Sequence, residues 1–385
     1  MFPLISIPLT FGMAIFGKQS KGYYWFLFSL GLSMFGLYFR PDSAFDIVRY
    51  FALMDNIGQL SNPFQVFGEQ MSTYAINSDG GDTNYLFNFF LWFIAKLRRP
   101  EILSGITIAL YYGGIGFVYL KGLKPQNDGK MALFAIISMF SVPMIYPISS
   151  VRFIFGIGIS FFINKWYFDS EKKSKFAILF LLIPLFIHNA LSLIVLTSMI
   201  IAIQKKVTLK KTLVYSAVGF GIVLLLISRK ININVQFLQN ILLKFDAYSI
   251  THSQLSWAII NGPGLLAIFS VILFISTNSK NAYSKFTYYA FVNNVLMSSI
   301  YILIPSLIER YSWAVMPLTS WLVYEIVKKN NKSIFFRWGV SAIFLTCGSY
   351  VGFEIVSQGF FHQVIRLDDD KMWWINYFSY FVFGK

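Results

Sequence analysis

Long apolar segments separated by short polar ones recur along almost the whole chain of 385 residues. A membrane-spanning helix needs about 18 or more predominantly apolar residues, and ten segments approach or exceed that length. They are 2–16, 22–39, 102–120, 131–147, 151–168, 212–228, 258–276, 286–305, 311–327 and 338–357. Because 56% of the residues are hydrophobic and only 13% are charged, we expect an all-α, polytopic helical membrane protein. It should form a single integral membrane domain over residues 1–385.

Positive charges are distributed unevenly among the polar segments. Six of these segments hold 19 of the 32 Lys and Arg residues but only 4 of the 17 Asp and Glu residues. They are 17–21, 121–130, 165–175, 204–211, 277–285 and 325–337. The positive-inside rule places them in the cytoplasm, with outer loops at 40–101 and 229–257 and an outer tail at 358–385. The net charge of +15 then reflects topology, and no nucleic-acid partner is expected.

Two apolar segments do not fit a simple crossing. Residues 83–97 are short and amphipathic, so we expect them to lie in the outer interface or to re-enter the membrane. Residues 176–203 have lysines at both ends and must return to the side from which they start. The turn falls near His188, and non-helical backbone at that depth is tolerated only where it faces protein or a water-filled cavity. We therefore expect His188 at the floor of an outward-facing cavity.

Arginine is concentrated on the predicted outer side, whereas the inner segments are almost all lysine. Eight of the nine arginines are on the outer side: Arg40, Arg49, Arg98, Arg99, Arg152, Arg229, Arg310 and Arg366. The planar guanidinium binds phosphate or carboxylate with two parallel hydrogen bonds. This pattern favours an anionic ligand such as a lipid pyrophosphate or an acidic sugar. Contact with lipid head groups, or pairing with outer acidic residues, would also account for it.

The stretch 38–50 places four candidate residues after the second predicted span: Arg40, Asp46, Arg49 and Tyr50. The last three are spaced to share one face of a helix. A helix cap with a local ion pair would explain the same residues without a ligand. The acidic residues at 78–84 lack the spacing of a metal site, and no nucleotide-binding motif is present. We therefore expect neither a metal nor another cofactor.

Two further candidate positions lie next to predicted helices. Arg152 opens the helix that precedes His188, and Glu309 and Arg310 lie between two spans. Ionisable residues that face the interior of a membrane bundle are candidates for function. The alternatives are that Arg152 extends to the membrane surface and that Glu309 and Arg310 form a structural pair.

Taken in order over roughly residues 25–325, these motifs resemble the Wzy/EpsG-type polysaccharide polymerases of bacterial envelopes. The Arg40–Asp46–Tyr50 stretch is similar to an early motif of that family, and SVRFIFGIGISFF resembles its arginine-containing helix, with Phe153 where glutamine is usual. LFIHNALSLIVL resembles a histidine motif, and Glu309-Arg310-Tyr311 resembles a late Glu-Arg site. Residues 83–97 occupy the place of another short family helix but lack its Glu-Pro-Gly sequence.

The resemblance implies a fold similar to the GT-C-type glycosyltransferases and a location in the bacterial cytoplasmic (inner) membrane. It implies polymerisation of undecaprenyl-pyrophosphate-linked oligosaccharide repeat units at the outer, periplasmic face, for O-antigen of lipopolysaccharide, capsule or exopolysaccharide. Expected partners are these lipid-linked oligosaccharides, membrane lipids, a Wzz-type chain-length co-polymerase and, more loosely, the repeat-unit flippase. An O-antigen ligase, a lipid-linked oligosaccharide flippase or transporter, and a membrane-bound acyltransferase are the alternatives.

The resemblance and the residue chemistry together assign roles to the candidate residues. Arg152 and Arg310, and after them Arg40, are expected to stabilise the departing pyrophosphate, because electrostatic stabilisation is usually the largest catalytic effect. His188 is expected to be the general base, with Asp46 as the alternative. The remaining predicted substrate-binding residues are Glu309, Arg49 and Tyr50.

Overall fold

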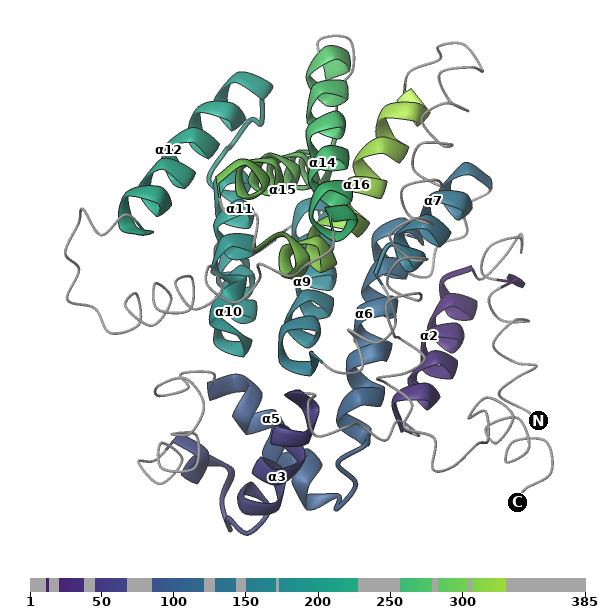
Figure 1. Ribbon diagram of the computed structural model, residues 1–385, viewed down its shortest axis with the longest axis vertical. Coiled ribbons are helices and arrows are strands. Elements are labelled where there is room, and N and C mark those ends of the chain that lie inside the picture. Colours follow the sequence, from purple (N-terminus) through teal and green to yellow (C-terminus); the bar gives the residue numbers. More distant parts are fainter. Residues whose placement is uncertain are drawn as a thin grey trace.

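The computed structural model describes residues 12–13, 21–37, 46–67, 85–120, 129–142, 150–170, 173–227, 257–278, 283–303 and 307–329. Within these ranges every regular element is a helix and no strand occurs, which confirms the all-α class (Figure 1). The longer helices are α2 (Lys21–Leu37), α6 (Ile102–Leu120), α9 (Val151–Asp169), α12 (Leu209–Ile227), α14 (Trp257–Asn278), α15 (Lys285–Leu303) and α16 (Ile308–Lys329). The shorter ones are α3 (Asp46–Ile57), η1 (Pro63–Phe67), α5 (Tyr85–Lys96) and α7 (Gly129–Phe140), with a broken segment at 175–202.

Seven of the ten predicted spans coincide with observed helices, with bounds that differ by three residues or fewer. α7 is the exception among the described segments, because it ends at Phe140 and not near residue 147. The predicted span 338–357 and most of 2–16 lie outside the described residues. Within the described part, one helix, Ile102–Tyr119, is long and apolar enough to cross a membrane.

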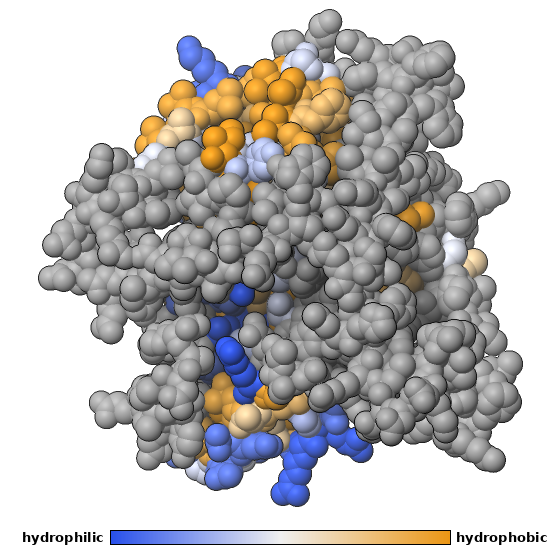
Figure 2. All heavy atoms as spheres, in the orientation of Figure 1, coloured by the Kyte–Doolittle hydropathy of each residue, from blue (hydrophilic) through white to orange (hydrophobic). Residues whose placement is uncertain are grey.

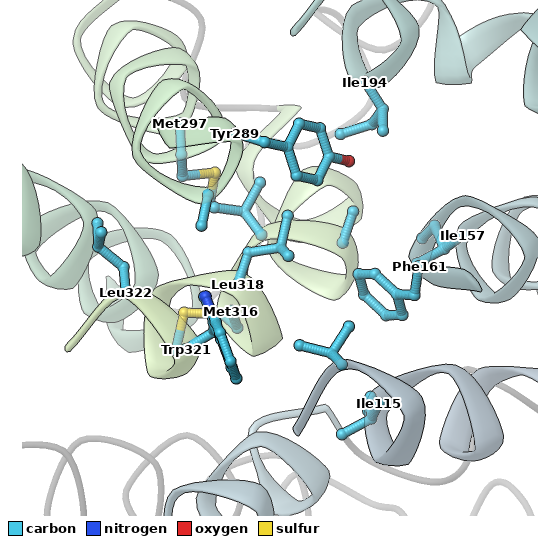
Figure 3. Packing of buried hydrophobic residues seen from close by; sticks show 14 of the residues in the cluster. Ile115, Ile157, Phe161, Ile194, Tyr289, Met297, Met316, Leu318, Trp321 and Leu322 are labelled. Carbon is cyan, nitrogen blue, oxygen red and sulfur yellow. The ribbon is translucent and has the colours of Figure 1, made fainter. Parts of the chain in front are cut away.

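Helices α2, α6 and α9 pack side by side through small residues. A side-chain carbon built on Gly158 of α9 would lie 2.8 Å from the backbone carbon of Leu110 of α6, and one built on Gly114 would lie 2.9 Å from the carbonyl oxygen of Gly158. The two backbones therefore touch at these glycines, as helices in membranes commonly do at small residues. Figure 3 shows Ile115, Ile157 and Phe161 of this pair facing the side chains of α15 and α16 across the core.

A proline inside α16 joins that helix to α6. Pro317 has no N–H group, so the carbonyl oxygen of Trp313 one turn earlier lacks its usual helical partner. The hydroxyl of Tyr111, on α6, donates to this oxygen at 2.8 Å. Burial of a carbonyl without a partner costs free energy. The bond from Tyr111 therefore compensates for the proline and fixes the position of α16 against α6.

Asparagine 294 links three helices at the centre of the C-terminal half. Its side-chain oxygen accepts from Ser270 of α14 at 2.9 Å and from Thr319 of α16 at 2.7 Å, while Asn294 itself belongs to α15. All three side chains are fully buried. Hydrogen bonds of this kind hold helices together in apolar surroundings, where hydrophobic burial does not distinguish one neighbour from another.

Residues 175–202 form a hairpin of short helices around His188, as the lysines at both ends of 176–203 predict. η2 (Lys175–Leu182) and α10 (Ile183–Ile187) lead into it, and η3 (Asn189–Leu191) and α11 (Ser192–Ala202) lead out. η2 lies beside α11. The two ends of the hairpin also come together: Lys285 Nζ donates to the carbonyl oxygen of Gln204 at 3.0 Å, and its charge acts on Lys173.

Helix ends that were predicted to share the cytoplasmic side lie together. Residues from the C-terminal parts of α9 and α16 and from the N-terminal parts of α7 and α15 line one cavity, and Lys165, Lys285 and Lys328 are among them. The other ends of α9 and α16 carry Arg152 and Arg310. The lysine-lined ends of α9 and α16 therefore lie at the opposite end of the bundle from Arg152 and Arg310.

Helices α3 and α5 form a separate layer below the larger bundle (Figure 1). Two bonds hold this layer together: Lys96 Nζ donates to the carbonyl oxygen of Gly58 at 2.8 Å, and Trp92 Nε1 donates to that of Leu60 at 3.1 Å. The apolar face of α3, with Ile47, packs in one cluster with α5, with Val151 and Phe155 of α9, and with Ile187 of α10. The predicted outer loop 40–101 is therefore helical over much of its described length, and this layer covers the start of α9 and the hairpin turn.

We expect Gly158→Ala to lower the stability of the protein. The added carbon would overlap the α6 backbone, and overpacking of this kind costs about 1–3 kcal/mol, more than the gain in helix propensity of about 1 kcal/mol. The measurement is the unfolding temperature of the detergent-purified protein. Gly221→Ala is the matched control, because nothing lies within 4 Å of the added carbon, and it should leave the unfolding temperature unchanged or raise it. An equally stable Gly158→Ala variant would contradict this packing.

Candidate active site at the His188 turn

His188 is an extended residue between two short helices, with φ −153° and ψ 122°. Its own N–H donates to the carbonyl oxygen of Pro184 at 3.0 Å, and its carbonyl oxygen accepts from Leu191 at 2.9 Å. Its side chain caps the next turn, because Nδ1 accepts from the backbone N–H of Ala190 at 3.0 Å. The imidazole therefore supplies an acceptor that the broken backbone needs, as Ser or Asn does at an ordinary helix start.

This cap determines which nitrogen of a neutral His188 carries the proton. A neutral imidazole has one donor nitrogen and one acceptor nitrogen. Since Nδ1 accepts from Ala190, the proton is on Nε2, which is then a hydrogen-bond donor. In this tautomer Nε2 can donate a hydrogen bond to an anionic oxygen. Nε2 can take a proton from a hydroxyl only in the other tautomer, in which Nδ1 carries the proton.

The first residues of α9 and α16 meet at this turn. The ring of Phe153, on α9, lies edge-on to the His188 ring with their centroids 5.4 Å apart. The hydroxyl of Tyr311, on α16, donates to the carbonyl oxygen of Ala190 at 2.5 Å. The rings of Phe153 and Tyr311 also contact each other, at 6.2 Å. Three segments that are far apart in the sequence are thus joined around Ala190.

Both predicted arginines directly precede these contact residues. Arg152 is adjacent to Phe153 and Arg310 is adjacent to Tyr311, and neighbouring Cα atoms are about 3.8 Å apart. The guanidinium carbon of Arg152 lies 5.7 Å from the centre of the Tyr50 ring, within the range of a cation–π interaction. The segments that carry His188, Arg152, Arg310 and Tyr50 therefore lie at one end of the bundle.

Tyr50 is held in place by an aromatic series. Its ring packs edge-on to Phe87 of α5 at 5.5 Å, and Phe87 packs edge-on to Phe155 of α9 at 5.7 Å. This series joins α3 to the first turn of α9, where Arg152 lies. Figure 2 shows hydrophilic atoms at the level where the α3 and α5 layer meets the larger bundle.

The structure describes the other predicted site residues only in part. Arg49 precedes Tyr50 on α3 and is exposed. Asp46 is the first residue of α3, one turn before Tyr50, and Glu309 is in the first turn of α16. The side chains of Asp46 and Glu309, and the whole of Arg40, lie outside the described residues.

His188 is less accessible than predicted, because it was expected at the floor of an open cavity. The residue is 5% exposed, because the Phe153 ring covers one side and the cap to Ala190 ties down Nδ1. A group that reaches Nε2 must therefore enter a tightly packed region.

No role was predicted for Tyr311 or for Ala190 from the residues alone. The bond between them joins residues 121 positions apart in the sequence, and no residue pattern signals it. The one available signal is that Tyr311 directly follows Arg310 at the start of a predicted span.

Comparisons with models of known protein families, with curated proteins and with solved structures find no match for this chain.

We expect Tyr311→Phe to loosen the His188 turn. The change removes one hydroxyl and leaves the carbonyl of Ala190 without this donor, a loss of about 1–3 kcal/mol for a buried group. The check is the unfolding temperature of the purified protein. Tyr215→Phe is the control, since Tyr215 is exposed on α12, and it should behave as the unchanged protein. Equal unfolding temperatures for the two variants would show that the bond does not stabilise the turn.

Proposed function

We propose that this protein is a glycosyltransferase of the bacterial cytoplasmic membrane that polymerises lipid-linked oligosaccharide repeat units. It would cross the membrane many times, with the His188 turn facing the exterior and the lysine-rich helix ends facing the cytoplasm. Its donor would be a growing glycan on undecaprenyl pyrophosphate, and its acceptor the next lipid-linked repeat unit. A Wzz-type co-polymerase that sets chain length is the expected protein partner.

The observation that carries this proposal is the meeting of three separate motifs at one end of an apolar helical bundle. Arg152, the His188 turn and Arg310 are linked through Phe153 and Tyr311 by contacts of 5.4 Å and 2.5 Å. Arginines beside a hydrogen-bond donor are suited to an anion with several oxygens, such as a pyrophosphate. The order of these motifs along the chain adds support through the resemblance to Wzy/EpsG-type polymerases.

In the proposed reaction the acceptor hydroxyl oxygen forms a bond to the anomeric carbon of the donor glycan. The bond from that carbon to the pyrophosphate oxygen breaks, and the polyprenyl pyrophosphate leaves with the electron pair. Negative charge on the leaving oxygen rises as the bond breaks. Arg152 and Arg310, with Arg40, would stabilise that charge, and fixed charges in a site with little water are effective for this purpose.

The acceptor hydroxyl must lose a proton, which a general base takes up. The bond from Ala190 to His188 Nδ1 favours Nε2 as a donor to the leaving pyrophosphate. Asp46, one turn from Tyr50 on α3, is then the preferred base. Glu309, Arg49 and Tyr50 would orient the arginines and the substrate.

Deletion of the gene followed by gel analysis of the surface glycan tests the function. Loss of a polymerase leaves a single repeat unit on its anchor. Loss of an O-antigen ligase leaves no glycan on the anchor, and loss of a flippase or transporter leaves repeat units inside the cell. Full ladders with lighter sugars would indicate an acyltransferase. Any of the last three results would replace the proposal.

His188→Asn separates the chemical role of the ring from its structural one. Asparagine is a good capping residue, so its side-chain oxygen should accept from Ala190 and the unfolding temperature should stay near that of the unchanged protein. Polymer formation should fall by roughly 10²- to 10⁴-fold, the usual effect of losing a group that transfers a proton or donates in the transition state. Polymer yield is measured in the deletion strain that carries the variant.

Two outcomes would change this assignment. A stable and fully active His188→Asn variant would leave His188 with the capping role alone. His188→Gln distinguishes a donor from a base, because its amide places an N–H near the position of Nε2 but cannot accept a proton. Substantial activity in the glutamine variant supports the donor role.

Arg152→Lys should also impair polymer formation, by roughly 10- to 100-fold, although it keeps the charge. A lysine is a point charge and cannot make two parallel bonds to one anion, and a hydrogen bond to a charged group is worth about 1.5–3 kcal/mol. Polymer yield is compared with that of Arg99→Lys, an exposed arginine in the turn after α5. Full activity of Arg152→Lys would refute bidentate binding of the anion by Arg152.

A further inference from the structure

A second charged region lies at the other end of α9 and α16. It is a cavity of about 910 Å³, and its lining includes Lys165, Trp166, Asp169, Lys285, Glu325 and Lys328. Lys165 is 13 residues beyond Arg152 on the same helix, which corresponds to about 20 Å along the axis. The cavity is thus separate from the His188 turn.

The wall of this cavity contains a buried ammonium group. Lys165 is 2% exposed, and its Nζ lies 3.0 Å from a carboxylate oxygen of Asp169. The same nitrogen is 4.0 Å from the centre of the Trp321 ring and 4.6 Å from that of Phe286. A buried cation destabilises a protein unless it is paired. Here the Asp169 carboxylate and the two aromatic rings stabilise the Lys165 ammonium group.

Lysines outnumber carboxylates around the cavity. Lys285 and Lys328 line it together with Lys165, against Asp169 and Glu325. Lys173 adds a further positive charge next to Lys285. Burial and then the Lys285 charge lower the pKa of Lys173 below its ordinary value, while Asp169 opposes this. Lys173 and Lys285 therefore repel each other, and an anion bound beside Lys285 would relieve this repulsion.

The rim of the cavity, next to these charged side chains, is formed by exposed aromatic residues. Trp166, which lines the cavity, is 44% exposed, and its ring packs edge-on to Phe180 with a separation of 5.9 Å. Phe176, on the same short helix as Phe180, is 76% exposed. Aromatic side chains next to lysines are typical of the zone where lipid head groups meet acyl chains.

We propose that this cavity binds the head group of an anionic phospholipid, with its phosphate at Lys285 and Lys328 and its acyl chains along Trp166 and Phe180. Lys165 and Asp169 would form the fixed base of the site. A free phosphate ion would satisfy the lysines but would leave the exposed aromatic rim without an apolar partner, and for this reason the lipid is favoured. The proposal rests on the membrane location proposed above but not on the polymerase chemistry.

The test uses the full-length protein purified in a neutral detergent and native mass spectrometry. Phosphatidylglycerol, phosphatidylcholine and inorganic phosphate are added in separate experiments at matched concentrations. We expect one phosphatidylglycerol to be retained per chain, at least tenfold more tightly than phosphatidylcholine. A Lys285→Gln, Lys328→Gln double variant should lose this preference. The matched control is Lys210→Gln with Lys211→Gln, two exposed lysines on α12, which should bind as the unchanged protein does.

Two results would overturn the proposal. Equal retention of phosphatidylglycerol by the Lys285/Lys328 variant and by the control variant would place the lipid elsewhere. Retention of inorganic phosphate as tight as that of phosphatidylglycerol would show that the aromatic rim adds nothing and that the lipid is not the ligand. The unfolding temperature of each variant is measured alongside, so that loss of the fold is not taken for loss of the site. Failure of this test leaves the polymerase proposal untouched, because gel analysis of the glycan examines that separately.

Discussion

The break in the chain at His188 depends on the hydrogen bonds of one small residue, Ala190. Its N–H donates to His188 Nδ1 and its carbonyl oxygen accepts from the hydroxyl of Tyr311. Buried backbone groups without partners cost several kcal/mol in an apolar environment. His188 therefore supplies the acceptor that a continuous helix would have given the Ala190 N–H, and the distant Tyr311 adds a second bond at the same residue. The bond to Tyr311 also ties the first turn of α16 to this segment.

Tyrosine hydroxyls serve the same purpose at a second place in the bundle. Tyr111 donates to the Trp313 carbonyl oxygen that Pro317 leaves without a helical partner. In both cases a tyrosine hydroxyl binds a backbone carbonyl of another segment close to an interruption in that segment's helix. The interruptions thus become cross-links between helices, and α16 takes part in both. This arrangement fixes the start of α16, where Arg310 lies, relative to α9, where Arg152 lies.

Much of the helical architecture follows from the sequence because apolar length and flanking charge are local signals. The bounds of α6, α9 and α15 and the return of the chain near His188 could be predicted for this reason. The capping role of His188 could not, since it depends on an extended backbone at a single residue. The early end of α7 and the buried charge of Lys165 were also missed. Lys165 was assigned to a cytoplasmic segment, and only its spacing of four residues from Asp169 indicates a pair.

The two ends of the bundle use different cations, and the chemistry of each explains its place. At the His188 turn a guanidinium lies over a tyrosine ring and can present two parallel donors to one anion, which suits a group whose charge changes during a reaction. At the other end, ammonium groups surround a cavity bordered by aromatic rings, and a flexible point charge suffices to hold a head group of varied shape. The positive-inside rule does not explain this difference, because it is met equally well by lysine and by arginine in the inner segments and requires neither on the outer side. The separation of the two residue types along α9 and α16 supports the proposal of two sites, one at each end of the bundle, over the alternative of a single charged channel.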